Sequence, residues 1–439
     1  MRRVIIFASL IFLLALPANA GLSHKVGSFQ SGTGAATTTV TFDPGFVPKA
    51  FRLWTSQQPG ITAGDNLSVS YGIATSQNGT SFDNQRSMWA GCIKVDPSVC
   101  KSRTNTALVI FVYTGTVSFA IAGSFSATSI SGSVVTLTVG TQWAADTLIN
   151  YEAWGGTDIT AWGIATMTVP ATASPTAFSD TSLNFQPDFA EFVISNTTTN
   201  DTETANAKFG MGFSDGTNSA LFAAACSDAA ATSVCGSYMR GAASQAEVLA
   251  NVNPAASVNI RISFTSFDAT GLTLSCVERN ASPFIFVLAF KGARWHVGTY
   301  TAATTATTFD VTDGAWTPVG VVASAALLTA QSTSDTGAAI FRIGFGASDG
   351  TSQGTIGFTG ADGRTANDRY WNMQSTSLLG LQVTTTSAVS AQDFSFTSFL
   401  ANGWRGTTVT AAAGQVFGVY YSFAANAATV APKHKVSIR

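Results

Sequence analysis

The chain alternates polar and apolar residues over many short runs, such as residues 37–42 and 67–73. Because successive side chains of a strand point to opposite faces of a sheet, this period predicts strands that bury one face. Residues 107–112 are almost all apolar, which favours a central strand covered on both faces. No long helical pattern occurs. Turn dipeptides separate the runs, among them Asn78-Gly79, Asp215-Gly216 and Asp349-Gly350.

Similar segments recur in the same order three times along the chain. The middle segments carry Gly72, Gly212 and Gly344, the late segments Phe125, Phe264 and Phe396, and the turns after them Gly132, Gly271 and Gly403. Their separations are nearly constant, which chance similarity in a Thr- and Ala-rich chain would not produce. The sequence therefore predicts three repeats, at 21–156, 157–292 and 293–427, between residues 1–20 and a basic tail at 428–439.

Each repeat contains about seven predicted short strands, a number typical of a β-sandwich. A unit of this length can bury enough surface to fold alone. The joins between repeats, at residues 155–157 and 291–293, are very short, so we expect neighbouring domains in a fixed relation, as in a stiff rod. The predicted fold is all-β, with three tandem antiparallel β-sandwich domains after an N-terminal signal peptide.

The signal peptide is predicted from the first twenty residues. Arg2 and Arg3 precede an apolar run at 4–16, and Ala18-Asn19-Ala20 supplies the small residues of a cleavage site. The run is too short to span a bilayer, which needs about 20 apolar residues, and no second long apolar segment follows. We therefore expect a secreted protein, extracellular or at the cell surface, without a membrane span.

Composition removes several functional classes from consideration. Charged residues make up 10% of the chain, against about 25% in a typical domain, and the formal net charge is −2. Such a balance gives no electrostatic reason to expect nucleic acid as a partner. The chain has 3 histidines and no glycine-rich phosphate loop. We therefore predict no metal site, no cofactor and no histidine-based catalysis.

In an exported chain the 5 cysteines favour disulfides. Cys92 with Cys100, and Cys226 with Cys235, form two close pairs that we interpret as local loop staples. A metal site is the alternative, but no histidine or third cysteine is near either pair. Cys276 remains, either as a buried strand residue or, less favoured, as half of an intermolecular bridge.

The G-x-S-x-G pattern of hydrolases occurs twice, around Ser214 and Ser348. In a hydrolase the serine lies on a strand-to-helix turn and a histidine follows later in the chain. Here no helical pattern follows either serine, and only His434 comes after Ser348. Ser-Asp-Gly also suits a tight hairpin turn. We predict two turns, no catalytic residue and a protein that is not an enzyme.

One region of each repeat combines aromatic and basic residues in what we predict to be a long loop after the middle strand. Such residues dominate interaction hot spots and also hold sugars, with a ring against the sugar face and a charged group on its hydroxyls. The alternative is that they cap one end of the sandwich. The candidate ligand-binding residues are Arg86, Trp89, Tyr238, Arg240, Arg369, Tyr370 and Trp371.

The strand and turn motifs resemble those of tandem β-sandwich repeats, jelly-roll or H-type-lectin-like, in bacterial and phage-related surface or structural proteins. The matching residues include the turn Gly45-Phe46-Val47-Pro48-Lys49, the opening strand at 295–300 and the late strand at 266–274. The resemblance covers nearly the whole chain after residue 20. It implies surface, virion-type structural, adhesive or lectin-like roles, and it transfers no binding residue.

Three functions follow as hypotheses. We favour a secreted structural or adhesive protein that presents repeated sandwich faces and assembles into a filament or surface layer. The alternative is a carbohydrate-binding module that uses the aromatic–Arg segments, and a secreted hydrolase is the least favoured. The expected partners are further copies of the chain or cell-surface glycans.

Overall fold

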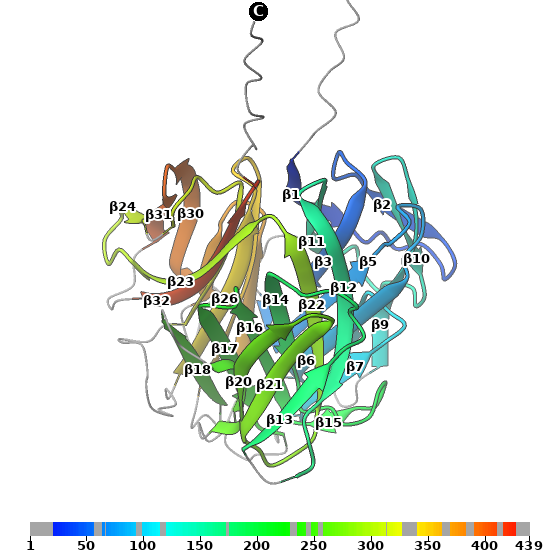
Figure 1. The fold of residues 1–439 in the computed structure, drawn as a ribbon. Coiled ribbons are helices and arrows are strands. Elements are labelled where there is room, and N and C mark those ends of the chain that lie inside the picture. Colours follow the sequence, from blue (N-terminus) through cyan, green and yellow to red (C-terminus); the bar gives the residue numbers. More distant parts are fainter. Residues whose placement is uncertain are drawn as a thin grey trace, which may run out of the picture.

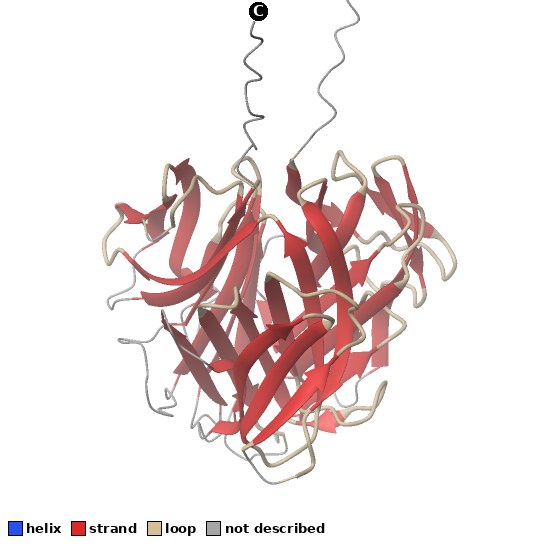
Figure 2. Cartoon of the chain, in the orientation of Figure 1, coloured by secondary structure: helices blue, strands red, loops and turns tan. Residues whose placement is uncertain are grey.

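The computed structural model describes residues 21–426, with gaps at 57–63, 66, 94–98, 115–119, 173–174, 229–234, 243–246, 253–257, 313, 327–339, 362–368, 383–389 and 411–415. The predicted signal peptide and the basic tail lie outside these residues. The described part consists of strands, turns and loops (Figure 2). It contains no helix long and apolar enough to cross a membrane.

The strands fall into three consecutive sets with the same order. The first set is β1 (Leu22–Gln30), β2 (Thr39–Phe42), β3 (Pro48–Thr55), β4 (Gly64–Asp65), β5 (Leu67–Thr75), β6 (Asn84–Ile93), β7 (Val99–Asn105), β8 (Ile110–Thr114), β9 (Ala120–Ser131), β10 (Val134–Val139) and β11 (Leu148–Gly156). The second set is β12 (Ile159–Thr168), β13 (Thr176–Asp180), β14 (Phe189–Ile194), β15 (Thr204–Ala205), β16 (Ala207–Ser214), β17 (Ser219–Cys226), β18 (Cys235–Ala242), β19 (Glu247–Val252), β20 (Val258–Asp268), β21 (Gly271–Glu278) and β22 (Phe284–Gly292). The third set is β23 (Arg294–Ala302), β24 (Thr308–Val311), β25 (Gly320–Ala326), β26 (Ile340–Ser348), β27 (Gln353–Ala361), β28 (Arg369–Gln374), β29 (Leu379–Gln382), β30 (Ser390–Leu400), β31 (Gly403–Thr410) and β32 (Val416–Ala424).

Each set forms an antiparallel sandwich, here called sandwich 1, 2 and 3. In sandwich 1 the large sheet has the order β1-β11-β3-β5-β6-β7 and the small sheet the order β2-β10-β9-β8, and the other two sandwiches repeat both orders. The last strand of each sandwich lies between its first and third strands, so the two ends of a repeat close it. The prediction of antiparallel sandwiches is confirmed, with more strands in each than expected.

The almost fully apolar run at 107–112 continues into β8, which lies at the edge of its small sheet rather than at the centre. Ile110, Phe111, Val112 and Tyr113 are all buried nevertheless. The large sheet covers one side of β8, and Phe111 and Tyr113 pack with Trp89 in a separate small cluster. Burial of both faces was predicted correctly, and the central position was wrong.

The structure shifts three of the repeat landmarks by two residues. A bulge skips Thr128, Thr265 and Thr397 in the late strands, so Ala127 rather than Phe125 is equivalent to Phe264 and Phe396. The same registers make Val134 rather than Gly132 equivalent to Gly271 and Gly403. In the middle strands a carbonyl of the small sheet lies close against Gly72, Gly212 and Gly346, so Gly346 replaces Gly344 as the third member. A two-residue shift keeps every side chain on the same face of the sheet, and the hydrophobic pattern does not detect it.

The three large sheets pack against one another around a common centre, and the small sheets lie outside them (Figure 1). One hydrophobic cluster contains buried residues of all three sandwiches, whereas each sandwich has its own smaller cluster between its two sheets. At the centre the rings of Tyr71, Phe209 and Phe345, one from each sandwich, have centroids 6.2–6.3 Å apart in all three pairs. The predicted rod is therefore wrong, because the outer face of each large sheet is apolar and needs cover.

Short strands also cross between sandwiches. The two residues of β15, from sandwich 2, pair with Ser102 and Lys101 at the edge of β7 in sandwich 1. In the same way β4, from sandwich 1, pairs with Trp371 and Tyr370 at the edge of β28 in sandwich 3. Each addition covers an edge that would otherwise expose unpaired backbone groups.

We predict that the full chain unfolds in a single transition, because the three sandwiches share one core. Replacing Phe345 with alanine should lower the free energy of unfolding of the whole chain by about 3–5 kcal/mol. Scanning calorimetry would show the number of transitions, and denaturant titration would measure the free energy of unfolding. The control is Val409→Ala, since Val409 is 59% exposed and its loss should change little. Two or three separate transitions, with only one of them shifted by Phe345→Ala, would contradict the shared core.

Candidate functional site

The residues predicted to form aromatic–Arg loops lie on strands instead. Arg86 and Trp89 lie on β6, Tyr238 and Arg240 on β18, and Arg369 to Trp371 on β28. The strand of sandwich 1 equivalent to β18 and β28 is β7. Arg86 and Trp89 lie on β6, so they do not occupy the position equivalent to the other candidates. The loop placement and the three-fold repetition of this site are therefore wrong. These segments are strands at or near the edge of a sheet, where polar and apolar residues alternate as they do here.

The residues of β6 serve packing. Trp89 is buried, its indole Nε1 donates a hydrogen bond to Ser68 Oγ at 3.0 Å, and its ring lies 4.7 Å from that of Tyr113. Arg86 is half-buried and its Nε donates to Thr166 Oγ1 of sandwich 2 at 2.8 Å. Trp89 therefore belongs to a core, and Arg86 belongs to the contact between sandwiches 1 and 2.

On β18 the two candidates converge on one carboxylate. The Tyr238 hydroxyl donates to Glu247 Oε2 at 3.0 Å, and Arg240 Nη1 contacts Glu247 Oε1 at 2.5 Å. Burial, together with the negative charge of Glu247, raises the pKa of Tyr238 to about 12. On β28, Arg369, Tyr370 and Trp371 have a described backbone, but their side chains lie outside the described part of the structure. Their ligand-binding role stays a prediction.

The two cysteine pairs occupy equivalent places. Cys92 and Cys100 face each other across β6 and β7 and form a disulfide, as predicted, with a Cα–Cα distance of 4.1 Å. Cys226 and Cys235 face each other in the same register across β17 and β18. Their disulfide stays a prediction. Cys276 is a buried free thiol on β21, in agreement with the favoured interpretation.

The two Ser-Asp-Gly segments form hairpin turns between β16 and β17 and between β26 and β27. Gly216 and Gly350 have φ values of 84° and 87°, which glycine adopts readily. Ser348 Oγ donates to the Ser352 carbonyl at 3.1 Å and accepts from the Gly350 amide at 3.1 Å, and Ser214 makes the matching contacts. Both hydroxyl groups are therefore part of a turn.

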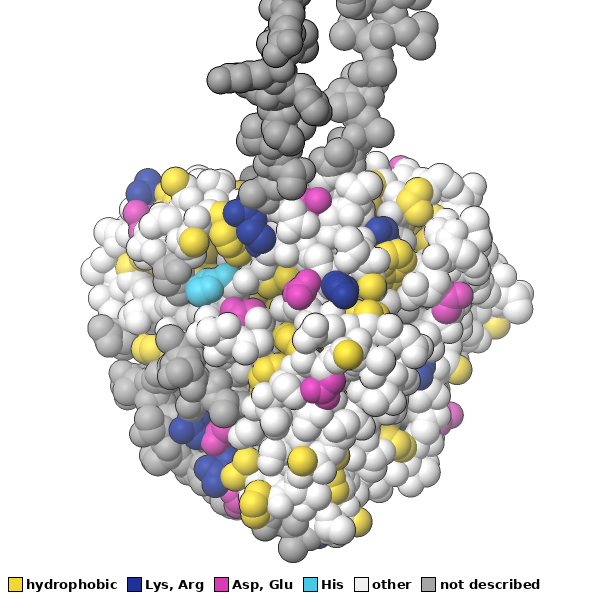
Figure 3. Space-filling model, viewed as in Figure 1, with side chains coloured by type: hydrophobic (Ala, Val, Ile, Leu, Met, Phe, Trp, Pro, Cys, Tyr) yellow, Lys and Arg dark blue, Asp and Glu magenta, His cyan; other side chains and the backbone are white. Residues whose placement is uncertain are grey.

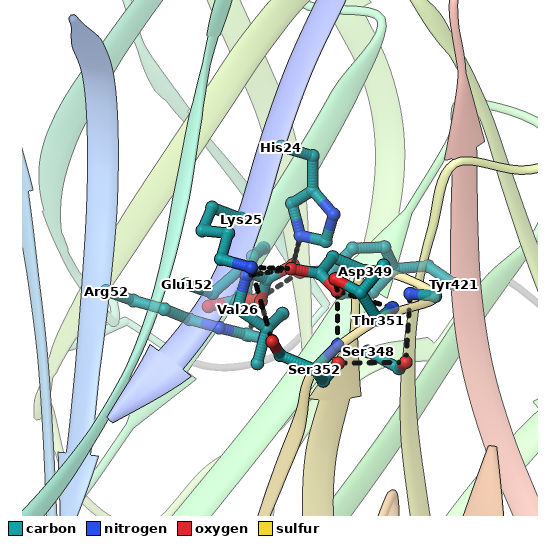
Figure 4. Close-up of polar contacts among 12 residues, drawn as sticks. His24, Lys25, Val26, Arg52, Glu152, Ser348, Asp349, Thr351, Ser352 and Tyr421 are labelled. Carbon is teal, nitrogen blue, oxygen red and sulfur yellow. Dashed lines mark hydrogen bonds and ion pairs between the residues drawn. The ribbon is translucent and has the colours of Figure 1, made fainter. Parts of the chain in front are cut away.

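The aspartates of these turns join one sandwich to the next. Asp215 Oδ2, in sandwich 2, accepts a hydrogen bond from the Val297 amide of sandwich 3 at 2.9 Å. Asp349 Oδ2, in sandwich 3, accepts one from the Val26 amide of sandwich 1 at 3.0 Å, and Lys25 Nζ lies 3.2 Å away (Figure 4). The motif that resembles a nucleophile elbow is thus a docking turn, used at two of the three junctions.

Asp349 has an environment suited to its charged form. Burial alone would raise its pKa, but hydrogen bonds from the Val26 and Ser352 amides, and from Thr351, outweigh this effect and lower the pKa to about 2. The ionised carboxylate of Asp349 is therefore the form that accepts the hydrogen bond between sandwiches 3 and 1.

Near the centre of the molecule lies a buried polar group, here called the central cluster: His24, Arg52, Tyr71, Glu152, Glu191 and Tyr421. Arg52 Nη2 pairs with Glu152 Oε2 at 2.5 Å, and Arg52 Nη1 pairs with Glu191 Oε2 of sandwich 2 at 2.6 Å. All three side chains are at most 1% exposed. The guanidinium carbon also lies 5.3 Å from the Trp54 ring centroid. Arg52 thus bridges two sandwiches inside an aromatic surrounding.

Hydrogen bonds from all three sandwiches complete the cluster. His24 Nε2 lies 2.8 Å from Glu152 Oε1 (Figure 4). The Tyr71 hydroxyl donates to Glu191 Oε1, and the Tyr421 hydroxyl of sandwich 3 donates to Glu191 Oε2 at 3.2 Å. Burial raises the pKa of Glu191, and the positive charge of Arg52 opposes this effect. For Arg52 burial acts to lower the pKa, but the two carboxylates outweigh it and raise the pKa. Arg52 is therefore the cation on which the buried carboxylates depend.

The three repeats differ at the positions of the central cluster. From the strand register, the equivalents of Arg52 are Glu191 and Val322, and the equivalents of Glu152 are Leu288 and Tyr421. Sequence reasoning missed these residues. The available signal was a charged residue inside an apolar strand of a charge-poor chain, as at Phe51-Arg52-Leu53 and Tyr151-Glu152-Ala153.

Comparison of the chain with protein-family models gave no match, and comparison with curated proteins gave none either. Among the described residues, no group of three or more His, Cys, Asp or Glu side chains is arranged to hold a metal ion. The interpretation of function therefore depends on the geometry of the chain itself.

Replacing Arg52 with methionine should lower the free energy of unfolding by about 3–5 kcal/mol, because two buried carboxylates would lose their cation. Denaturant titration would measure the loss. Arg405→Met is the matched control, since Arg405 forms an exposed pair with Asp310 and its loss should barely move the midpoint. A triple variant, Arg52→Met with Glu152→Leu and Glu191→Val, should regain part of the stability. Equal stability of Arg52→Met and the wild type would contradict this role.

The junction at Asp349 should make stability depend on acid pH. The folded-state pKa lies below the ordinary value of 3.8, so the stabilisation is present above about pH 4 and is lost as the pH falls toward 2. Asp349→Asn should therefore cost roughly 1–2 kcal/mol at pH 7, allowing for solvent screening. The difference between variant and wild type should shrink as the pH falls from 4 to 2. A pH-independent difference, measured by denaturant titration at each pH, would show that the charge is not involved.

Proposed function

We propose that this chain is a non-enzymatic surface protein that works as one rigid, three-lobed adhesive head. The observation that carries the proposal is the shared core, which fixes the faces of three similar sandwiches relative to one another. A body of this kind presents several related surfaces at once, and simultaneous contacts raise the total affinity of weak sites. Adhesion fits this arrangement better than polymerisation through sheet edges, because β15 and β4 cover two of the large-sheet edges.

The positions of the two ends of the body support the same proposal. The Gly21 carbonyl accepts a hydrogen bond from the Asp158 amide at 3.4 Å, and the Asn426 amide donates to Asp158 Oδ2 at 2.8 Å. Both ends therefore meet at one residue, on the upper face in Figure 1. The flanks and the opposite face are left for contact with a partner.

The surface is poor in charge. Figure 3 shows wide areas without Lys, Arg, Asp or Glu, and the charged residues that are visible are scattered. Long-range electrostatic attraction is therefore a weak driving force for this protein. We expect its contacts to depend on hydrogen bonds, apolar patches and single ion pairs at short range, and so to be only slightly sensitive to salt.

A bead assay tests the proposal. The chain, coupled to beads through its C-terminal end, should bind to cells or to immobilised extracellular glycans, and the binding should change little between low and high salt. Beads that carry acid-unfolded chain are the control. Absence of binding to every cell and glycan surface would contradict adhesion. An esterase activity that Ser214→Ala or Ser348→Ala abolishes would contradict the non-enzymatic part of the proposal.

A further inference from the structure

A pocket of about 390 Å³ lies where sandwich 1 meets sandwich 2, beside the join between β11 and β12. Its volume is within the usual range for small-molecule sites, about 300–1,000 Å³. We call it the junction pocket. Aromatic, apolar and polar residues of both sandwiches line it, among them Ser23, Phe46, Val47, Lys49, Gln77 and Trp162.

Lys49 gives the junction pocket a cation. Its Nζ donates to the Ile159 carbonyl at 2.6 Å and lies 4.4 Å from the centroid of the Trp162 ring. The side chain is half-buried, and among the described residues it forms no ion pair with a carboxylate. Burial lowers the pKa of Lys49. A partly desolvated ammonium without an anion is costly, and an anionic ligand would relieve that cost.

The aromatic wall beside Lys49 is held in place by hydrogen bonds. Trp162 Nε1 donates to the Ser76 carbonyl at 2.8 Å, and Gln77 Nε2 donates to the Trp162 carbonyl at 2.7 Å. Val47 is one of the large apolar side chains exposed on the described surface, at 47%. The pocket thus combines a fixed ring, an exposed apolar side chain and a cation, which suits a ring-shaped ligand with one negative group.

The other two junctions lack this combination. The residue after the equivalent proline is Asp188 in sandwich 2 and Val319 in sandwich 3. At the second junction Asp188 Oδ2 accepts from the Gly292 amide, and Trp295 stacks on Phe189 at 4.3 Å. At the third, His24 replaces the tryptophan and packs against Phe423. Among the described residues, the combination of Lys49 and a tryptophan at these equivalent positions therefore occurs at one of the three junctions.

We propose that the junction pocket binds an acidic monosaccharide, with the sugar carboxylate on Lys49 and the apolar face of the sugar against Trp162, Phe46 and Val47. Gln77 and Ser23 then lie within the same pocket to meet the sugar hydroxyls. The inference rests on the proposed adhesive function and specifies the chemistry that the head recognises. It also replaces the segments around Trp89 and Tyr238 as the sugar site, because both of these side chains are buried.

Titration calorimetry of the full chain with D-glucuronic acid, N-acetylneuraminic acid and neutral D-glucose tests the site. We expect at least one acidic sugar to bind more tightly than glucose. Lys49→Met keeps the aliphatic stem and removes the charge, and it should weaken acidic-sugar binding by roughly tenfold to a hundredfold. Binding should also weaken at alkaline pH, as Lys49 loses its proton. Trp162→Leu should weaken the binding as well.

Arg405→Met is the matched control, because it removes one positive charge from sandwich 3 and should leave sugar binding unchanged. A single unfolding transition for Lys49→Met would establish that the variant is folded. The inference is overturned if no acidic sugar binds, if glucose binds as tightly, or if Lys49→Met binds as well as the wild type. Beads that adhere while no acidic sugar binds would overturn this site alone. Acidic-sugar binding that is lost in Lys49→Met, without any adhesion by the beads, would support the site and contradict the adhesive function.

Discussion

The large sheet of each sandwich is apolar on both faces, and the rest of the structure depends on this constraint. Every residue of β16 and β17 is buried, as is almost every residue of β11. A two-sheet sandwich covers only the inner face of such a sheet. The outer face has to pack against something else, and here it packs against the large sheets of the two other sandwiches. Three closed units in series therefore form one body with a common core.

The polar residues at the centre give that body a defined order. Arg52, Glu152 and Glu191 form ion pairs at the contact between sandwiches 1 and 2. The other two contacts cannot form the same pairs, because the equivalent positions hold Val322, Leu288 and Tyr421. Buried polar groups have fixed register and partner choice in other proteins, at some cost in stability. We infer the same role here.

Local patterns in the sequence predicted local structure well. The strand at residues 67–73, the hairpin turns at Asp215-Gly216 and Asp349-Gly350, and the Cys92–Cys100 pair each depend on neighbours within a few strands, and all are present. The half-burial predicted for residues 67–73 is wrong, because Ser68 and Ser70 on the polar face of that strand are buried as well. The arrangement of the repeats was not predicted, because the contacts that decide it join residues far apart, such as Arg52 and Glu191. The loop placement of the candidate site was wrong for a related reason. The sequence around a tryptophan on a strand near a sheet edge looks the same whether the ring faces solvent or, like Trp89, packs in a second cluster.

The central claim is that the three repeats form one compact body, and small-angle X-ray scattering of the protein in solution tests it most directly. A compact chain of this length should have a radius of gyration of roughly 22 Å, and its pair-distance distribution should show one symmetric peak. A clearly larger radius, with a skewed distribution that extends to the length of three sandwiches in a row, would contradict the shared core and favour a rod.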